Sequence, residues 1–333
     1  MIVVFDSNVW IAELGLRSTL GAVARFYLKH TKARLALPEV VRLEVEHNLR
    51  NRLKEHITRI EDDHRQLLTV FGTLNPLVVP DPSAIEATVN ELFGSLGIDV
   101  LDVPFSLASA RSSFLQTINK LPPSDKTQEF KDGVMWADCV KLLEQDDVCL
   151  VTADKAFFQN REYAKGLSRT LAAEIAPAKN RFSLMPSLNI LMADFRVDVP
   201  IEETLLVQSH LAKNAQAIDG LLGRNGFVLG QKLSLSKVLY ATEDPSVVYL
   251  EFSMDFEAKE VADDGRIDGV VTSAGDGTYD TNRHTFTNLR SLGDTLRFQL
   301  GDGTQCQAQN AYAYAESFQG HRVVSHTVRY KLP

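Results

Sequence analysis

Four acidic residues in the first half of the chain are placed where they could act together: Asp6, Glu44, Asp132 and Asp154. Asp6 directly follows the apolar run Ile2–Phe5, and Asp154 follows a second apolar run. A carboxylate so close to a core costs free energy unless it is paired or bound to a cation. Carboxylate oxygens are the ligands that Mg²⁺ and Mn²⁺ prefer. The four side chains therefore form a candidate metal site, where a metal-activated water can attack a phosphate ester.

The elements that must position these acids alternate along the chain. Hydrophobic spacing predicts strands over residues 2–5, 34–38, 98–103 and 147–154, and helices over 18–32, 39–72, 83–95, 106–119 and 131–145. This alternation predicts a parallel sheet with helices on its faces, and such sheets bind ligands at the carboxyl ends of their strands. Asp6 and Asp154 end two strands, so we expect them at one edge. Glu44 and Asp132 lie near the starts of two helices and are expected to lean over that edge.

Each acid also has a simpler explanation. Asp6 and Asp132 are suitable caps for helices, and Glu44 and Asp154 are compatible with solvated surface positions. For any one residue alone, the simpler explanation is preferred. Two acids at strand ends combined with two acids at helix starts favour a shared site.

Four segments carry a resemblance to a known family. In order, "VVFDSNVW", "LPEVVRLEVEHNL", "FKDGVMWADCVKLL" and "CLVTADKAFF" resemble the four signature segments of PIN-domain nucleases. The resemblance covers roughly residues 1–185. It implies a Rossmann-like α/β fold that cuts single-stranded RNA, or DNA in some branches, with Mg²⁺ or Mn²⁺.

The resemblance also implies a role for each matching residue. The metal ligands would be Asp6, Glu44, Asp132 and Asp154, supported through hydrogen bonds by Ser7, Asn8 and Thr152. The chain departs from short members of the family by a helical insertion, which we expect over about residues 50–120. This departure argues against carrying over the substrate preference of the small members.

Several neighbouring residues are weaker candidates. Glu46 competes with the acid two positions before it, because the two lie about 200° apart around a helix and only one can face the site. Asp138 is either an auxiliary ligand or a solvated helix residue. Lys126, Lys131 and Lys155 lie beside the acidic segments, either as phosphate contacts or as ordinary surface lysines.

The pattern changes in the last third of the chain. We expect a PIN-like domain over 1–198, a connecting helix over 199–222 and an antiparallel β domain over 223–333, where alternation of period two dominates and Asp-Gly marks a hairpin. Strands near Leu250–Phe256 and Thr327–Leu332 are expected to end at a sheet edge, where they could pair with another chain. The β domain is therefore expected to mediate homo-oligomerisation or the binding of a protein partner.

Composition excludes several classes of protein. The chain has 333 residues, 44% of them apolar, and a net charge of −8, which argues against a coat of positive charge for nucleic acid but not against a local basic groove. Its three cysteines have neither disulfide nor metal spacing, so a reducing cytoplasm fits. No run approaches the ~18 apolar residues of a membrane span, and no signal peptide is expected.

The sequence thus leads to one preferred function and two alternatives. The preferred function is a Mg²⁺- or Mn²⁺-dependent nuclease that acts on RNA or single-stranded DNA. One alternative is a PIN scaffold without activity that binds a partner. The other is a phosphatase for small phosphate esters.

Overall fold

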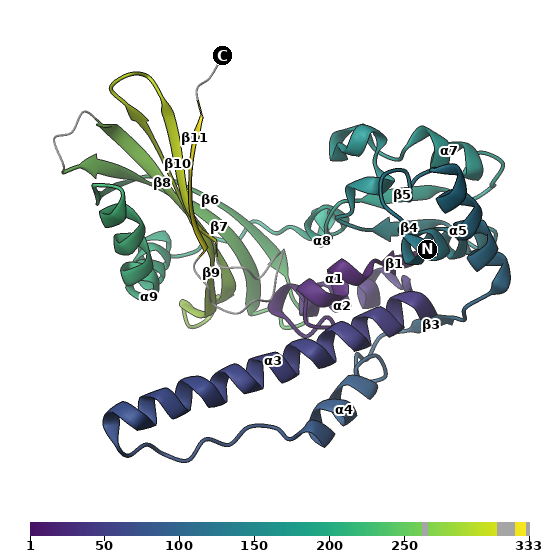
Figure 1. Cartoon of the computed structure of the whole chain (residues 1–333), viewed down its shortest axis with the longest axis horizontal. Coiled ribbons are helices and arrows are strands. Elements are labelled where there is room, and N and C mark those ends of the chain that lie inside the picture. The colour runs from purple at the N-terminus through teal and green to yellow at the C-terminus, as the bar shows by residue number, and fades with distance from the viewer. Residues whose placement is uncertain (262–265, 312–323, 331–333) are drawn as a thin grey trace. The chain divides into compact units, whose positions relative to one another are not determined.

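The computed structural model describes residues 1–261, 266–311 and 324–330, and it divides into two compact units, Met1–Asp194 and Phe195–Pro333. The first unit contains a sheet with helices, and the second contains long antiparallel strands (Figure 1). The predicted fold class, a parallel α/β domain followed by an antiparallel β domain, is confirmed. Among the helices of the described ranges, none has the length and apolar character to cross a membrane.

The sheet of the first unit has five parallel strands in the order β3-β2-β1-β4-β5. They are β1 (Ile2–Phe5), β2 (Arg34–Pro38), β3 (Val100–Val103), β4 (Val148–Val151) and β5 (Phe182–Met185). The central strand β1 is buried along its whole length, as its uninterrupted apolar run predicts. β5 is not among the predicted strands, because it is short, only half-buried and at the sheet edge.

The register of β1 and β4 fixes the position of two candidate residues. Phe5 lies opposite Val151, so Asp6 and Thr152 follow side by side where the two strands end. The chain leaves β1 toward β2 and β3 on one side, whereas β4 and β5 lie on the other side. This is the switch point of the sheet, the usual ligand position in open α/β folds.

Helices connect these strands. They are α1 (Ser7–Ala12), α2 (Thr19–Thr31), α3 (Glu39–Phe71), α4 (Pro82–Asn90), α5 (Leu107–Asn119), α6 (Phe130–Leu142), α7 (Arg169–Ile175) and α8 (Leu188–Leu191). The predicted insertion over about 50–120 contains most of α3, then α4 and α5. It also contains β3, so the same segment completes one edge of the sheet.

The long helix α3 has two different halves. Its first turns bury Val41, Val45 and Leu49, whereas its remaining residues are half-buried or exposed. The chain returns along α3 to α4 (Figure 1), and Arg50 Nε donates to Glu86 Oε2 at 2.6 Å between the two helices. The first half therefore positions Glu44, while the second half extends away from the sheet.

The second unit is a sheet of six antiparallel strands in sequence order, with one helix against it (Figure 1). The strands are β6 (Phe227–Ala241), β7 (Val247–Glu260), β8 (Arg266–Asp280), β9 (Thr285–Leu300), β10 (Gln305–Ala311) and β11 (Val324–Tyr330), and the helix is α9 (Glu203–Arg224). The hairpin predicted at Asp-Gly joins β9 to β10.

The core of the second unit lies between α9 and one face of the sheet. Alternate residues of β7, such as Phe252 and Met254, pack in the same core as Leu206 and Leu221 of α9. The helix expected as a connection over 199–222 is therefore grouped with the sheet. The expectation that Leu250–Phe256 ends at a sheet edge is wrong, because β7 is paired on both sides. The described part of the other expected segment, Thr327–Leu332, belongs to β11 at a sheet edge, and its last two residues lie outside the described residues.

Candidate functional site

Asp6 begins the candidate site at the carboxyl end of β1, where its side chain is only 4% exposed. Its carboxylate makes no capping bond to α1. It accepts hydrogen bonds from Thr152 Oγ1 and Asn8 Nδ2, both at 2.6 Å, and from Ser7 Oγ at 3.3 Å. These donors are the three residues expected to support the site. The bonds hold the Asp6 carboxylate in place, and the part that they play in binding a cation stays a prediction.

Asp154 lies just beyond the neighbouring strand and is tied to the same hydroxyl. Its backbone N–H donates to Thr152 Oγ1 at 2.9 Å, and that hydroxyl in turn donates to the Asp6 carboxylate. One oxygen, Oδ1, accepts from Ala156 N at 2.8 Å and caps the 3₁₀ turn η1 (Lys155–Phe157). The simple role of a cap thus holds for one oxygen of Asp154. The Thr152 hydroxyl links the two strand-end segments.

Glu44 and Glu46 point to different surroundings. The charge of Glu44 contributes to the raised pKa of Asp6, and its carboxylate also pairs with Lys131 at the start of α6. Glu46 pairs instead with Arg50 at 3.2 Å, on the side where α4 is held. Because the two positions lie about half a turn apart on α3, Glu44 lies beside the strand ends, whereas Glu46 faces α4 in the insertion.

The carboxyl groups of the site raise one another's pKa values. Burial raises the pKa of Asp132 to about 8, and the charges of Asp6, Asp154, Glu129 and Glu44 add to the shift. Burial likewise raises the pKa of Asp6 to about 6, with smaller contributions from Asp154 and Glu44. The structure thus brings the four predicted acids within electrostatic reach of one another. It adds Glu129, which no sequence signal indicates.

Asp138 has a different environment. It is 1% exposed, and Ser109 Oγ donates to its Oδ1 at 2.6 Å. Lys141 lies 4.0 Å from the same oxygen. These contacts tie α6 to α5, so the structure supplies a packing role for Asp138. It is neither a solvated helix residue nor a contributor to the shifted pKa values of Asp6 and Asp132.

The four acids are suitable ligands for a divalent cation, but their side chains are not grouped tightly enough to bind one. All four offer only carboxylate oxygens, and the raised pKa values of Asp6 and Asp132 result from burial first and from the neighbouring negative charges second, both of which a bound cation would offset. No three His, Cys, Asp or Glu side chains of the described part of the chain are grouped tightly enough to hold an ion. The donor set fits a hard divalent cation in kind, and Glu44 would have to turn away from Lys131 to join it.

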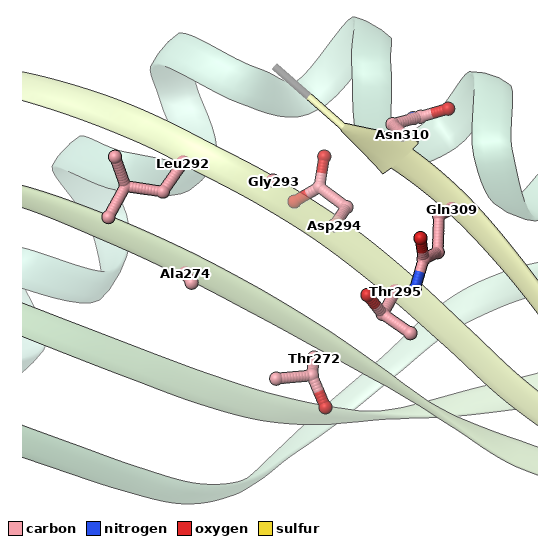
Figure 2. Close-up of a pocket in the computed structure, with 8 residues that line it drawn as sticks. All are labelled: Thr272, Ala274, Leu292, Gly293, Asp294, Thr295, Gln309 and Asn310. Atoms are coloured by element: carbon pink, nitrogen blue, oxygen red, sulfur yellow. The ribbon is translucent and has the colours of Figure 1, made fainter. Parts of the chain in front are cut away.

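The second unit has a pocket that contains none of the predicted site residues. It has a volume of about 220 Å³ and lies over β8, β9 and β10. Figure 2 shows polar side chains that line it from the three strands, among them Thr272, Thr295 and Gln309, together with one acid, Asp294. It holds no acidic cluster of the kind found in the first unit, so the candidate catalytic chemistry belongs to the first unit.

Comparison with known proteins agrees with this assignment. A family model described as PIN domain matches residues 3–157, which include all four candidate acids. Curated proteins and solved structures give no significant match. PIN domains are typically nucleases that use divalent metals and bind nucleic acid. With its parallel sheet and its acids near the ends of two strands, the N-terminal part of this chain is thus similar to PIN domains over residues 3–157.

Proposed function

We propose that the chain is a Mg²⁺- or Mn²⁺-dependent nuclease that hydrolyses phosphodiester bonds in RNA or single-stranded DNA. The observation that supports this most is the position of Asp6, Glu44, Asp132 and Asp154, whose charges interact where β1 and β4 end. A bound divalent cation would supply an activated water and stabilise the charge that develops on the phosphate. The resemblance and the family match support the same class of reaction.

The side chains of the site would prepare it in three ways. The hydrogen bonds to Asp6 fix one ligand before any cation arrives. Asp132, with a pKa of about 8, holds a proton at neutral pH, so the metal-free cluster carries less charge. Lys131 neutralises Glu44 until that carboxylate turns toward the cation.

The test is a substrate panel with the full chain. Single-stranded RNA, single-stranded DNA, a duplex and a small phosphate ester are each incubated with Mn²⁺, with Mg²⁺ and with EDTA. We expect cleavage of a single strand that requires the metal and that Asp6→Asn abolishes. The matched control is Asp62→Asn, which changes an exposed acid in the outer half of α3 and should cleave like the wild type.

Two other results would replace the proposal. Turnover of the small ester alone would identify a phosphatase. No turnover, with no rise in the unfolding temperature on adding Mn²⁺, would identify a scaffold that binds partners, because a preformed site gains stability from its ligand.

We also propose that the second unit mediates self-association or the docking of a protein partner. Its sheet ends in β6 on one side and β11 on the other, and strand edges pair readily with other chains. Light scattering of the full chain tests this, since a strictly monomeric chain with no partner would contradict it. The three cysteines are free and buried, which supports a reducing location such as the cytoplasm.

A further inference from the structure

The segment after Asp154 folds back toward the candidate site. It passes through the 3₁₀ turns η1 (Lys155–Phe157), η2 (Gln159–Arg161) and η3 (Tyr163–Lys165). The Tyr163 hydroxyl donates to the backbone oxygen of Ala153 at 2.7 Å, and Ala153 directly precedes Asp154. The hydroxyl end of the Tyr163 side chain is therefore fixed within two residues of a candidate metal ligand.

The Tyr163 ring is held firmly but left open to solvent. Phe158, which is 2% exposed, packs against it in a T-shaped contact with ring centroids 4.9 Å apart. Tyr163 itself is 41% exposed. Core packing does not require an aromatic ring that is so exposed, and a ring held by a neighbouring ring and at its hydroxyl loses little freedom when a flat ligand binds.

A cation already lies against this ring. Lys155 Nζ is 5.4 Å from the ring centroid. The neighbouring cations Arg161 and Lys165 pair with Asp125 and Glu162, whereas Lys155 forms no ion pair with any of the residues that the structure describes. Lys155 is exposed and follows Asp154 directly. One exposed positive charge and one hydrogen-bonded aromatic ring therefore lie side by side next to Asp154.

We propose that Tyr163 and Lys155 form a platform for one unpaired nucleotide beside the scissile phosphate. The base stacks on the Tyr163 ring, and the Lys155 ammonium leaves the ring for a phosphate oxygen of the bound strand. This proposal rests on the proposed nuclease function and names two residues that position its substrate.

Two energetic comparisons favour this exchange. Stacking of a base on an aromatic ring is stronger than a cation–π contact at an exposed site. A phosphate also offers the Lys155 ammonium a full negative charge, which the Tyr163 ring does not. Both partners therefore gain when a nucleotide replaces their mutual contact. A base inside a duplex cannot reach the ring without leaving its stack, so the platform selects single strands.

The experiment compares a normal single-stranded oligonucleotide with one that lacks bases around the cleavage position. For the wild type we expect KM to be about tenfold lower for the normal strand, since stacking contributes this much per base, with kcat nearly equal. Tyr163→Ala should raise KM about tenfold for the normal strand and leave it unchanged for the abasic strand. Tyr163→Phe should stay close to wild type, because it keeps the ring.

Two further variants separate stacking from charge and from general surface effects. Lys155→Gln should raise KM for both strands alike and weaken its dependence on salt, as the loss of a phosphate contact does. Phe114→Ala is the matched control. It removes another exposed aromatic ring of the same unit, on α5, and should change KM for neither strand.

The outcomes distinguish this proposal from the nuclease function. If the wild type cleaves both strands with the same KM, the platform is wrong and the nuclease function stands. If the wild type cleaves nothing, the nuclease function fails, and fluorescence anisotropy of the bound strands decides the platform. Equal affinity for normal and abasic strands would then overturn it. The wild-type comparison needs no variant, so a Tyr163→Ala protein that fails to fold does not weaken the test.

Discussion

At the scale of single residues, Asp6 and Asp132 have different surroundings. Asp6 accepts hydrogen bonds from three side chains, which offset part of the cost of its charge. Asp132 is surrounded by acids, and its raised pKa reports a carboxylate that the metal-free fold disfavours. Removal of the charge should therefore have opposite effects on stability and on function.

We expect Asp132→Asn to stabilise the metal-free protein at pH 7 by on the order of 2 kcal/mol, because burial and the neighbouring charges force Asp132 to take up a proton on folding, and an amide avoids that cost. The same variant should lose the stabilisation by Mn²⁺ and the nuclease activity. Urea unfolding with EDTA and with Mn²⁺ measures both effects. Asp62→Asn, on the exposed half of α3, serves as the control. A less stable Asp132→Asn protein in EDTA would show that this carboxylate is not under repulsion.

The choice between Glu44 and Glu46 gives a second prediction at this scale. Glu44→Gln should lower kcat on a single strand about 100-fold or more, as loss of a metal ligand does. Glu46→Gln should keep activity within about twofold and cost less than about 1 kcal/mol of stability, because it loses only a partly exposed pair with Arg50. The reverse ranking would mean that α3 presents Glu46 to the site.

The acids themselves could be predicted because they are local signals, namely charges at the ends of apolar strands or in the first turns of helices. The contacts between distant residues could not. Lys131 of α6 pairs with Glu44 of α3. Glu129, the N-cap residue of α6, helps to raise the pKa of Asp132. Tyr163 lies in a run of short turns without periodicity. Only the fold places such residues beside the site.

At the scale of elements, strands and helices with a strong hydrophobic periodicity could be predicted from the sequence. Short or irregular segments were missed. β5 and the turns after Asp154 lack a pattern. The helix α9 was expected, but an amphipathic helix does not reveal which sheet it will cover. Besides the apolar core that α9 shares with the sheet, a buried polar contact joins the two: His210 of α9 bonds to Ser273, which in turn bonds to Asp294.

The His210 contact has a defined direction. Asn214 Nδ2 donates to His210 Nδ1, so the neutral imidazole carries its proton on Nε2 and donates to Ser273 Oγ, which donates to Asp294 Oδ1. Burial lowers the pKa of His210 to about 4 and raises that of Asp294 to about 6. Phe252 forms a T-shaped contact with the imidazole. Among the described residues, no cation forms an ion pair with Asp294.

These two shifts oppose each other in their effect on stability. Between pH 6.5 and 4 the unfolded chain protonates His210 before the folded chain does, so acidification costs about 3 kcal/mol. Between about pH 6 and 4 the folded chain instead protonates Asp294 before the unfolded chain does. Acidification therefore raises the free energy of unfolding by about 3 kcal/mol over this range. In the wild type the two effects nearly cancel.

We therefore expect single variants to reveal slopes of opposite sign. Relative to wild type, Asp294→Asn should be more stable at pH 7 and should lose that advantage as the pH falls to 4. His210→Gln should gain stability relative to wild type over the same fall in pH. Urea unfolding of the full chain at several pH values measures the differences, in which the other titrating groups cancel. Parallel curves for the two variants would show that neither group titrates as described.

At the scale of the whole molecule, the chain carries its two units one after the other with a very short connection. The division falls between Asp194 and Phe195, and by Val197 the chain is already bonded to the second unit, where its N–H donates to Leu239 O at 2.9 Å. The sequence placed the change of pattern near residue 223 because alternation begins there. The sequence pattern of a helix does not show that it shares a core with the strands that follow it.

Limited proteolysis of the full chain distinguishes the two borders. Arg196 lies beside the division and is exposed, whereas Arg224 ends α9 and donates to Asn310 Oδ1 at 3.0 Å within the second unit. Arg196 forms a short β-bridge with Tyr240, and fraying of this bridge is enough to expose the Arg196–Val197 bond, whereas cleavage after Arg224 requires α9 to leave its core. Trypsin should therefore produce a resistant fragment that begins at Val197 and retains α9. Mass spectrometry identifies the ends of the fragments. A resistant fragment that begins at Asn225 would show that the strands fold without α9 and that the border lies where the alternation starts.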